Sequence, residues 1–226
     1  MTVSAILLAA GRGRRMERQE NKAFLSIAGT PVLAWAATAL ARSPRVDELI
    51  VVARAEELGI AAALLPPLDI SVRIVEGGEE RQDSALAGVA AATGDIILLH
   101  DAARPFPSQA LIERVIDGTL RHGACIPILP VVDTLRLVQG TGFATPDPVD
   151  RTGLVRVQTP QGFRADLVRK ALSEWRSRVP MTDDAAAVLA CGIPVATVLG
   201  DLWNLKLTTP EDLAFAEAAA ERVERA

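Results

Sequence analysis

The residues best suited by type and spacing to do chemistry occur near the start of the chain. An apolar run ends in Ala9 and Ala10, a glycine- and arginine-rich loop follows it, and an isolated Lys22 comes after the loop. A strand that enters such a loop offers backbone N–H groups and cationic side chains at one point, as a polyphosphate requires. A dinucleotide-binding fingerprint would need glycine where Met16 stands, and the chain has no Gly-Lys pair of a Walker loop. The pattern predicts a tight turn or a triphosphate site with Gly11, Gly13, Arg15 and Lys22.

Two further groups of residues follow predicted strands. Gly77 and Gly78 precede Ser84, and two glycines let the backbone approach a flat ligand such as a nucleotide base. Asp101, with the small Ala102 after it, ends another predicted strand, where a carboxylate can hold Mg²⁺ or a ribose hydroxyl. One aspartate suffices for Mg²⁺ when phosphates and waters complete the coordination. In the alternative interpretation, Ser84 only packs and Asp101 only caps its loop.

Several polar blocks follow in the second half of the chain. Each block could form a turn or a helix cap by itself, and Thr182 in particular has the residue type of an N-cap. Together they offer hydroxyl groups and cations suited to a phosphorylated polyol. The blocks are Asp133-Thr134, Asp150-Arg151, Gln158 to Gln161, Thr182 to Asp184, and Asn204 with Lys206 and Thr208.

The elements that must position these residues alternate along the first 131 residues. Apolar runs predict strands at residues 3–9, 49–53, 72–75, 95–99 and 124–131. Helical patterns lie between them at residues 31–42, 55–65, 82–93 and 107–122, with Ser108 as a candidate cap of the last. This order predicts an α/β fold with a mostly parallel sheet and helices on both faces. Ligands bind at the carboxyl ends of such strands, where the glycine loop and Asp101 both fall.

The pattern changes after residue 131. Residues 132–138 and 152–157 are predicted β segments around a turn at residues 140–150, so that residues 131–158 form a β arm. The arm either reaches a partner subunit or forms an edge hairpin on its own domain. Helices at 165–178 and 183–191, a strand at 195–199 and a final helix from Pro210 complete the prediction. Because the sequence has no repeat and no low-complexity segment, we expect residues 1–226 to form a single domain.

Composition excludes several classes of protein. The chain is 50% hydrophobic and 23% charged with a net charge of −4, which is typical of a soluble domain and disfavours nucleic-acid binding. Cys125 and Cys191 are far apart, and His100 and His122 add no cluster, so we expect neither a disulfide nor a zinc site. No segment approaches the roughly 18 uninterrupted apolar residues of a membrane span. We expect a cytoplasmic protein without a membrane partner.

Taken in order, these blocks resemble the 2-C-methyl-D-erythritol 4-phosphate cytidylyltransferase family of the non-mevalonate isoprenoid pathway. The resemblance covers essentially the whole chain. It implies a Rossmann-like nucleotidyltransferase fold with a protruding β arm that interlocks a homodimer. The implied reaction joins CTP and methylerythritol phosphate into a CDP-alcohol and pyrophosphate with Mg²⁺ or another divalent cation. The blocks are residues 9–16 with Lys22, 77–84, 100–105, 133–134, 150–151, 158–161, 182–185 and 204–208.

The resemblance also implies roles for individual residues. Arg15 and Lys22 would stabilise charge at the α-phosphate, while the backbone of Ala9, Ala10, Gly11 and Gly13 would hold phosphates. Gly77, Gly78 and Ser84 would recognise cytosine, and Asp101 and Ala102 would lie near the ribose, with Asp101 at the metal. Methylerythritol phosphate would contact Arg104, Thr159, Thr182 and Lys206, joined by Thr134 and Arg151 from the neighbouring subunit's arm.

The chain departs from the family pattern beside the catalytic positions. Leu8 and Asn21 stand where the family usually has proline, and Ala23 and Phe24 replace Gln and Tyr after Lys22. Because proline fixes φ, we expect the approach to Lys22 to be more mobile before CTP binds. Ribitol phosphate cytidylyltransferases share the early blocks and are the nearest alternative. A nucleotide-binding sensor without catalysis and a nicotinamide oxidoreductase are the alternatives from other classes.

Overall fold

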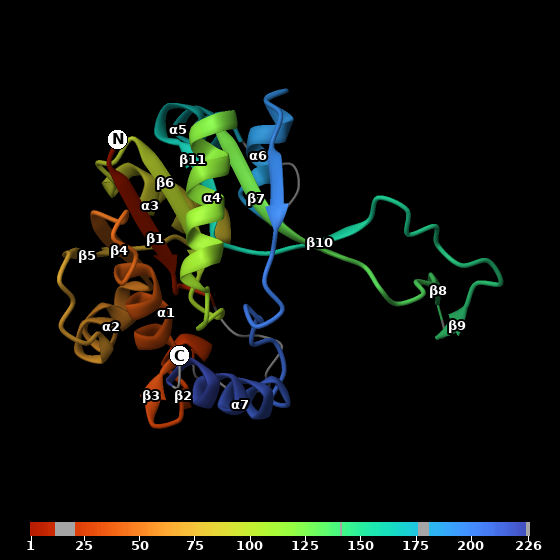
Figure 1. Ribbon diagram of the computed structural model, residues 1–226, viewed down its shortest axis with the longest axis horizontal. Helices are drawn as coiled ribbons and strands as arrows, with labels where there is room; N and C mark the ends of the chain where they lie inside the picture. Colours follow the sequence, from red (N-terminus) through yellow and green to blue (C-terminus); the bar gives the residue numbers. More distant parts are fainter. Residues whose placement is uncertain (12–20, 141, 176–180, 225–226) are drawn as a thin grey trace.

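The computed structural model describes residues 1–11, 21–140, 142–175 and 181–224, and an eight-stranded mixed sheet forms the centre of this part of the chain (Figure 1). The strand order is β10-β7-β11-β6-β1-β4-β5, and β12 also pairs with β7. The strands are β1 (Val3–Leu8), β4 (Glu48–Ala53), β5 (Ser71–Glu76), β6 (Ile96–Asp101), β7 (Ala124–Pro130), β10 (Val155–Val157), β11 (Gln161–Arg164) and β12 (Ala196–Leu199).

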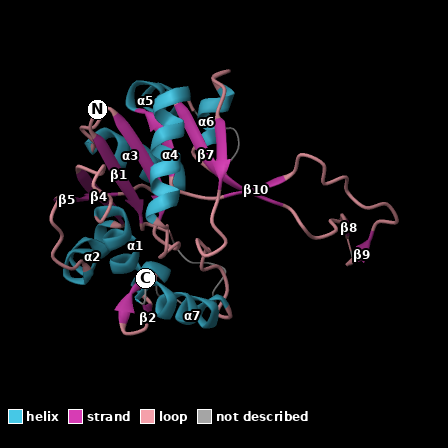
Figure 2. Cartoon of the chain, viewed as in Figure 1, coloured by secondary structure: helices cyan, strands magenta, loops and turns pink. Residues whose placement is uncertain are grey.

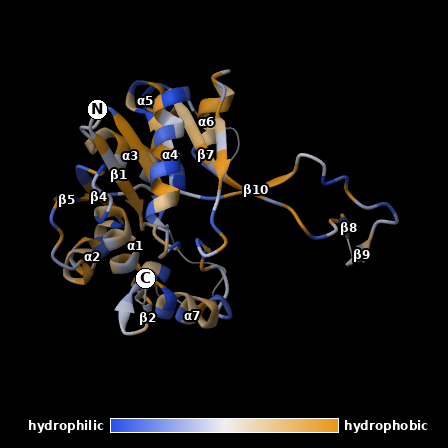
Figure 3. Cartoon of the chain, viewed as in Figure 1, coloured by the Kyte–Doolittle hydropathy of each residue, from blue (hydrophilic) through white to orange (hydrophobic). Residues whose placement is uncertain are grey.

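The parallel half of the sheet confirms the prediction from the apolar runs. β1 lies between β4 and β6 and is parallel to both, with Leu8 opposite Val52 on one side and Asp101 on the other. The side chains of β1 alternate between the faces, since Leu7 packs in one core cluster and Ile6 in the other. Figure 3 colours most of the central strands as hydrophobic, as expected for strands that are covered on both faces.

Helices cover both faces of the sheet, as the sequence predicted (Figure 2). One face packs against α1 (Val32–Ala41), α2 (Leu58–Leu64) and α4 (Gln109–His122), and the other against α3 (Arg81–Ala91), α5 (Ala165–Glu174) and α6 (Ala185–Ala190). A third cluster joins α7 (Asp212–Glu224) to α1 and to the hairpin of β2 (Ser26–Ile27) and β3 (Thr30–Pro31). Among the described residues, no helix is long and apolar enough to cross a bilayer.

The observed ends of three helices can be compared with the boundaries and the cap that the sequence predicted. Ser108 caps α4 as predicted, because its hydroxyl accepts a hydrogen bond from the N–H of Leu111. The predicted helix at 55–65 is wrong as one element, since it divides into a short 3₁₀ helix, η3 (Ala55–Glu57), and α2. The last α-helix begins at Asp212 rather than Pro210, because the N–H groups of Asp212, Leu213 and Ala214 bond the carbonyls three residues before them, as in a 3₁₀ turn. The Asp212 carboxylate accepts the N–H of Thr209, as expected for Thr209 at the N-cap and Asp212 at the third helical position.

The strand β11 was not predicted. It lies between β6 and β7 and is antiparallel to both, so the sheet is mixed rather than a simple continuation of the parallel half. Its sequence, Gln-Gly-Phe-Arg, has no apolar run, and Phe163 alone fills the core, with no exposed surface. Gly162 is required for close approach, because a β-carbon there would lie 2.2 Å from the Thr119 hydroxyl of α4.

The segment between β7 and β10 leads away from the sheet to a small ladder of β8 (Val138–Gln139) and β9 (Phe143–Ala144) (Figure 1). Figure 2 draws most of it as loop, so the predicted β segment at 132–138 is regular only at its far end. The predicted turn at 140–150 is too long, because Leu135 still pairs with Val149. The chain therefore reverses between β8 and β9, and residues after Ala144 already belong to the returning side.

Candidate active site

A cavity of about 400 Å³ lies at the carboxyl ends of β1 and β6 beside the first turn of α3. Its volume falls within the roughly 300–1,000 Å³ of small-ligand pockets. The loops after β1, β5 and β6, the start of the 3₁₀ helix η2 (Lys22–Phe24) and the segment before α7 all contribute to its wall. The predicted site residues that line it are Ala9, Ala10, Gly11, Lys22, Gly78, Ser84, Asp101, Ala102 and Lys206.

The described residues of the predicted triphosphate site, Ala9 to Gly11 and Lys22, form the wall of the cavity beyond the end of β1. The N–H of Ala9 donates to the carbonyl of Val52 at 2.8 Å, which extends the alignment of β1 and β4 up to the loop. Among the described residues, no atom lies within 4 Å of a β-carbon built on Gly11. Lys22 Nζ donates to the Thr208 carbonyl at 2.7 Å. Gly13 and Arg15, predicted to belong here, lie outside the described residues.

The glycine pair after β5 lets α3 approach the loop after β1. A β-carbon on Gly77 would lie 2.6 Å from the Ser84 hydroxyl and 3.0 Å from the β-carbon of Ala10, and one on Gly78 would lie 2.2 Å from Asp83. Gly77 is therefore adjacent to the cavity wall without lining it, whereas Gly78 and Ser84 line it. Packing thus explains the two glycines before any ligand is considered.

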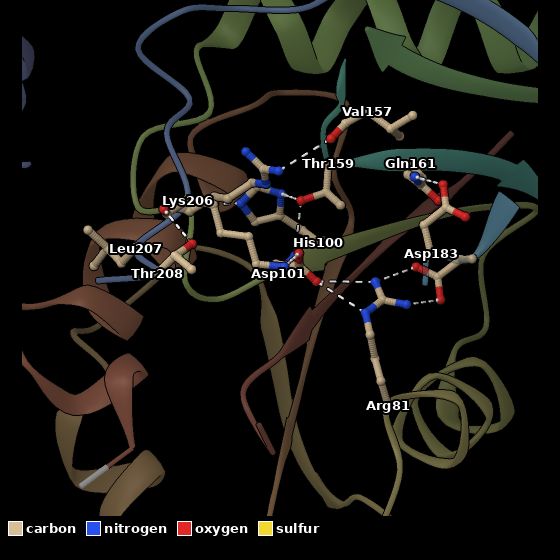
Figure 4. Close-up of polar contacts among 12 residues, drawn as sticks. Arg81, His100, Asp101, Val157, Thr159, Gln161, Asp183, Lys206, Leu207 and Thr208 are labelled. Carbon is tan, nitrogen blue, oxygen red and sulfur yellow. Dashed lines mark hydrogen bonds and ion pairs between the residues drawn. The ribbon is translucent and has the colours of Figure 1, made fainter. Parts of the chain in front are cut away.

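Asp101 is the meeting point of the charged side chains in the cavity (Figure 4). Lys206 Nζ donates to Asp101 Oδ2 at 2.7 Å, and Arg81 Nη2 donates to Oδ1 at 3.1 Å. Burial favours the protonated carboxyl, but the positive charges of Arg81 and Lys206 outweigh it and hold the pKa of Asp101 well below its ordinary value. Asp101 is therefore a carboxylate at neutral pH.

Arg81 is itself held from a second side. Its guanidinium forms two hydrogen bonds of 2.8 Å to the carboxylate of Asp184, which has no exposed surface. Burial opposes the charge of Arg81, but the carboxylates of Asp184 and Asp101 raise its pKa above the ordinary value. This bidentate pair ties the first residue of α3 to the start of α6 and fixes the guanidinium that faces Asp101.

A chain of hydrogen bonds behind the cavity fixes the backbone of the loop after β6. The N–H of Asp101 donates to the Thr159 hydroxyl at 3.1 Å, and that hydroxyl lies 3.0 Å from His100 Nδ1. His100 Nε2 lies 2.9 Å from the carbonyl of Arg104, which can only accept. Nε2 must therefore carry the proton, and the Thr159 hydroxyl donates to Nδ1. Burial lowers the pKa of His100 from 6.5 to about 4, consistent with this neutral ring.

A second set of contacts joins the start of β11 to the segment that carries Lys206. Gln158 exchanges two hydrogen bonds with the backbone of Asp201, of 2.8 and 2.9 Å. Asn204 donates to the Thr159 carbonyl at 2.6 Å and accepts at its own carbonyl from Arg104 at 2.8 Å. Residues 158–161 and 201–206 are therefore placed relative to Asp101 by contacts between polar side chains and the backbone.

The remaining predicted residues lie away from the cavity within one chain. Thr159 is 4% exposed and reaches the cavity only through Asp101. Thr182 is exposed beside α6, and Arg104 donates to backbone carbonyls. Thr134 and Arg151 are exposed at the base of the projecting segment, and Arg151 donates to the Val132 carbonyl. Among the described residues, the structure therefore brings together most of those predicted to contact phosphate, base and metal, but not these five residues.

Sequence reasoning assigned no role to several residues that build the site. Arg81, His100, Gln158 and Asn204 all occur inside the polar blocks, which was the available signal, but their spacing did not reveal their partners. Asp184 is 103 positions from Arg81, so the pair between them is a product of the fold.

Asp101 is the cavity residue best suited to a divalent cation. Among the described residues, no three His, Cys, Asp or Glu side chains are grouped to hold a metal. Mg²⁺ bound together with a nucleotide needs only one or two carboxylates, because phosphates and waters supply the other oxygen ligands. The ionised Asp101, facing a cavity that Glu79 and Glu80 also line, fits that requirement.

Comparisons with known proteins agree with this geometry. A family model described as 2-C-methyl-D-erythritol 4-phosphate cytidylyltransferase matches residues 3–222. A protein of that name from Nocardia farcinica is 47% identical over 224 residues, covering 98% of this chain and 95% of its own length. One from Geobacillus kaustophilus is 38% identical over 222 residues, with 96% of each chain covered. The crystal structure of the Thermus thermophilus protein of that name has a TM-score of 0.81 at 37% identity, covering 98% of this chain and 100% of its own.

Proposed function

The chain belongs to the 2-C-methyl-D-erythritol 4-phosphate cytidylyltransferase family, and from this premise we propose how its cavity carries out the family's reaction. It transfers CMP from CTP to 2-C-methyl-D-erythritol 4-phosphate in isoprenoid biosynthesis and releases pyrophosphate. A phosphate oxygen of the acceptor attacks the α-phosphorus of CTP in line, and the bond from that phosphorus to the pyrophosphate oxygen breaks. The observation that most directly supports this reaction is that one cavity is lined by Lys22, Asp101 and Lys206, which come from three distant segments of the chain.

The wall beyond β1 would bind the triphosphate. Gly11 lines the cavity, where its backbone N–H would meet phosphate oxygens, and Lys22 would supply a positive charge beside them. Lys22 and Arg15 would stabilise the negative charge that builds on the α-phosphate and on the leaving pyrophosphate. Gly78 and Ser84, on the cavity wall at α3, would contact the cytosine, with Gly77 supporting them.

Asp101 would hold the divalent cation and contact the ribose, with Ala102 beside it. A cation bound there would neutralise phosphate charge, which is the chemistry that the metal supplies. Arg81 supports this role because it is fixed by Asp184 and keeps the Asp101 carboxylate oriented and ionised.

The acceptor phosphate would bind beside Lys206, near Arg104, Thr159 and Thr182. Thr134 and Arg151 lie on the projecting segment and do not line the cavity of their own chain. This supports a homodimer in which the arm at residues 131–158 of one subunit completes the cavity of the other. The cytoplasmic location expected from the sequence remains a prediction.

Pyrophosphate release is the decisive assay. Purified protein with CTP and Mg²⁺ should release pyrophosphate when methylerythritol phosphate is added, and far less with ribitol phosphate or with no acceptor. Greater turnover of ribitol phosphate would assign the other acceptor class. CTP binding without pyrophosphate release from any acceptor would indicate a nucleotide sensor and refute the proposed reaction.

A further inference from the structure

The residue directly before Lys22 is fixed on three sides. Asn21 is 5% exposed, and its Nδ2 donates to the Ala9 carbonyl at 2.6 Å and to Glu57 Oε2 at 2.8 Å. Its Oδ1 accepts a hydrogen bond of 3.1 Å from the N–H of Ala23 and so caps η2. Both amide protons and the amide oxygen therefore have partners in one arrangement.

Glu57 anchors this arrangement from η3, which follows β4. It is 5% exposed, and its other carboxylate oxygen forms an ion pair with Arg54, which follows β4. The hydrogen bond to Glu57 raises the pKa of Arg54 above its ordinary value. Because the Ala9 carbonyl and the Glu57 carboxylate can only accept, the NH₂ group of Asn21 must face both of them. The amide orientation of Asn21 is therefore determined by its surroundings.

The backbone of Asn21 has the geometry of a proline without the ring. Its φ is −67° and its ψ is 126°, and a proline ring fixes φ near −65°. The sequence predicted a mobile approach to Lys22 because no proline stands at position 21. The side-chain contacts of Asn21 hold this backbone at residue 21, whereas residues 12–20 of the approach lie outside the described residues, so their mobility stays a prediction.

We propose that Asn21 is a positioning residue for Lys22. Its side chain fastens the start of η2 to the end of β1, where the loop from Ala9 to Gly11 begins, and to the Arg54–Glu57 pair at the end of β4. The Lys22 ammonium is thereby held at a fixed place relative to the backbone that faces the triphosphate. This inference rests on the proposed function and names what sets the geometry of that catalytic group in this chain.

The expected signature is a loss of turnover with little loss of nucleotide affinity. A misplacement of about 1 Å costs up to about 100-fold in rate, whereas CTP binding is shared among many contacts along the cavity wall. Asn21→Ala should lower kcat about 10- to 100-fold and change the Kd for CTP by less than about threefold.

Two variants at the anchor provide a matched comparison. Glu57→Gln weakens the contact with Arg54 or with Asn21, because an amide cannot accept from both sides, and should lower kcat about three- to tenfold. Glu56→Ala is the control, since Glu56 pairs with the same Arg54 at 3.1 Å but its side chain is 66% exposed. It should behave as the wild type. If Asn21→Ala does not fold, Glu57→Gln against Glu56→Ala decides the question.

The measurements are kcat for pyrophosphate release, the Kd for CTP and hydrogen exchange at the Ala23 amide. An Asn21→Ala kcat within twofold of the wild type, or a Glu57→Gln kcat equal to that of Glu56→Ala, would overturn the inference. If the wild type itself releases no pyrophosphate, the proposed function fails separately. In that case Ala23 exchange decides, because faster exchange in Asn21→Ala supports the fixed placement of η2 and unchanged exchange overturns it.

Discussion

Mild acid should destabilise the protein through His100, whose buried ring is neutral in the native state. His100 has no exposed surface, and burial lowers its pKa from 6.5 to about 4. Its ring is neutral in the native state, with Nε2 donating to the Arg104 carbonyl and Nδ1 accepting from Thr159. Protonation would place a charge in a site without exposed surface, near the cations Arg104 and Lys206, so the native state resists the proton.

The sign and size of the effect follow from that difference in pKa. The unfolded chain binds a proton at His100 below its ordinary pKa, whereas the native chain does not until about pH 4. The His100 contribution is therefore complete above pH ~6.5 and is lost progressively as the pH falls toward ~4. Between pH ~7 and pH ~5 the free energy of unfolding should fall by about 2 kcal/mol, or about 4–8 °C in melting temperature.

The assay is urea unfolding of the wild type and of His100→Gln between these two pH values. The glutamine amide can still donate to the Arg104 carbonyl but does not titrate, so the variant should lose most of the pH dependence. The pKa values of Asp101 and Glu48, the latter about 2, lie below this window. Burial raises the pKa of Asp184, but Asp184 is present in both proteins, so the difference between the wild type and His100→Gln reports on His100. Equal pH dependence in both proteins would refute the assignment of a neutral, buried His100.

Three other perturbations test the charges and the arm. Arg81→Met leaves the buried Asp184 carboxylate without its cation and should lower the free energy of unfolding by about 3–5 kcal/mol. The double variant Arg81→Met with Asp184→Leu should recover much of this loss in urea unfolding. Equal losses in the single and double variants would contradict the pairing of Arg81 with Asp184. Lys22→Ala and Arg15→Ala should each lower kcat about 100-fold or more with little change in melting temperature, and normal pyrophosphate release would remove their catalytic roles. Inactive Lys22→Ala and Arg151→Ala chains, when co-expressed, should regain activity as mixed dimers, and sedimentation showing only monomers would exclude the contribution of Arg151 from a partner.

The sequence predicted the parallel half of the sheet because its strands are covered on both faces. Such strands must be apolar throughout, so the runs in β1, β4 and β6 were visible without any knowledge of their neighbours. The same logic placed Asp101 and the loop after Ala10 at one edge, since parallel strands end on the same side. Both indeed line the cavity.

The antiparallel strand β11 could not be predicted, because its residues are not apolar throughout. β11 is four residues long and is completed by its neighbours, with Gly162 making room for α4 and Phe163 filling the core. The polar residues before it are buried, but they are paired with backbone groups far away in the chain, as Gln158 is with Asp201. A local pattern carries no information about partners at such separations, so buried polar residues of this kind look like loop residues in the sequence.

The two cations on Asp101 differ in a way that matters for an anionic substrate. Arg81 is held by two hydrogen bonds to Asp184 in addition to its contact with Asp101. Lys206 has a side chain that is 39% exposed, and it donates to Asp101 from a loop. A phosphate entering the cavity can therefore attract the Lys206 ammonium at small cost, whereas moving Arg81 would leave Asp184 buried and unpaired. We expect Arg81 to keep Asp101 ionised and oriented when substrate binds, whereas the Lys206 ammonium should leave Asp101 and pair with the substrate phosphate. Asp101 would then place both the bound cation and the phosphate-binding Lys206.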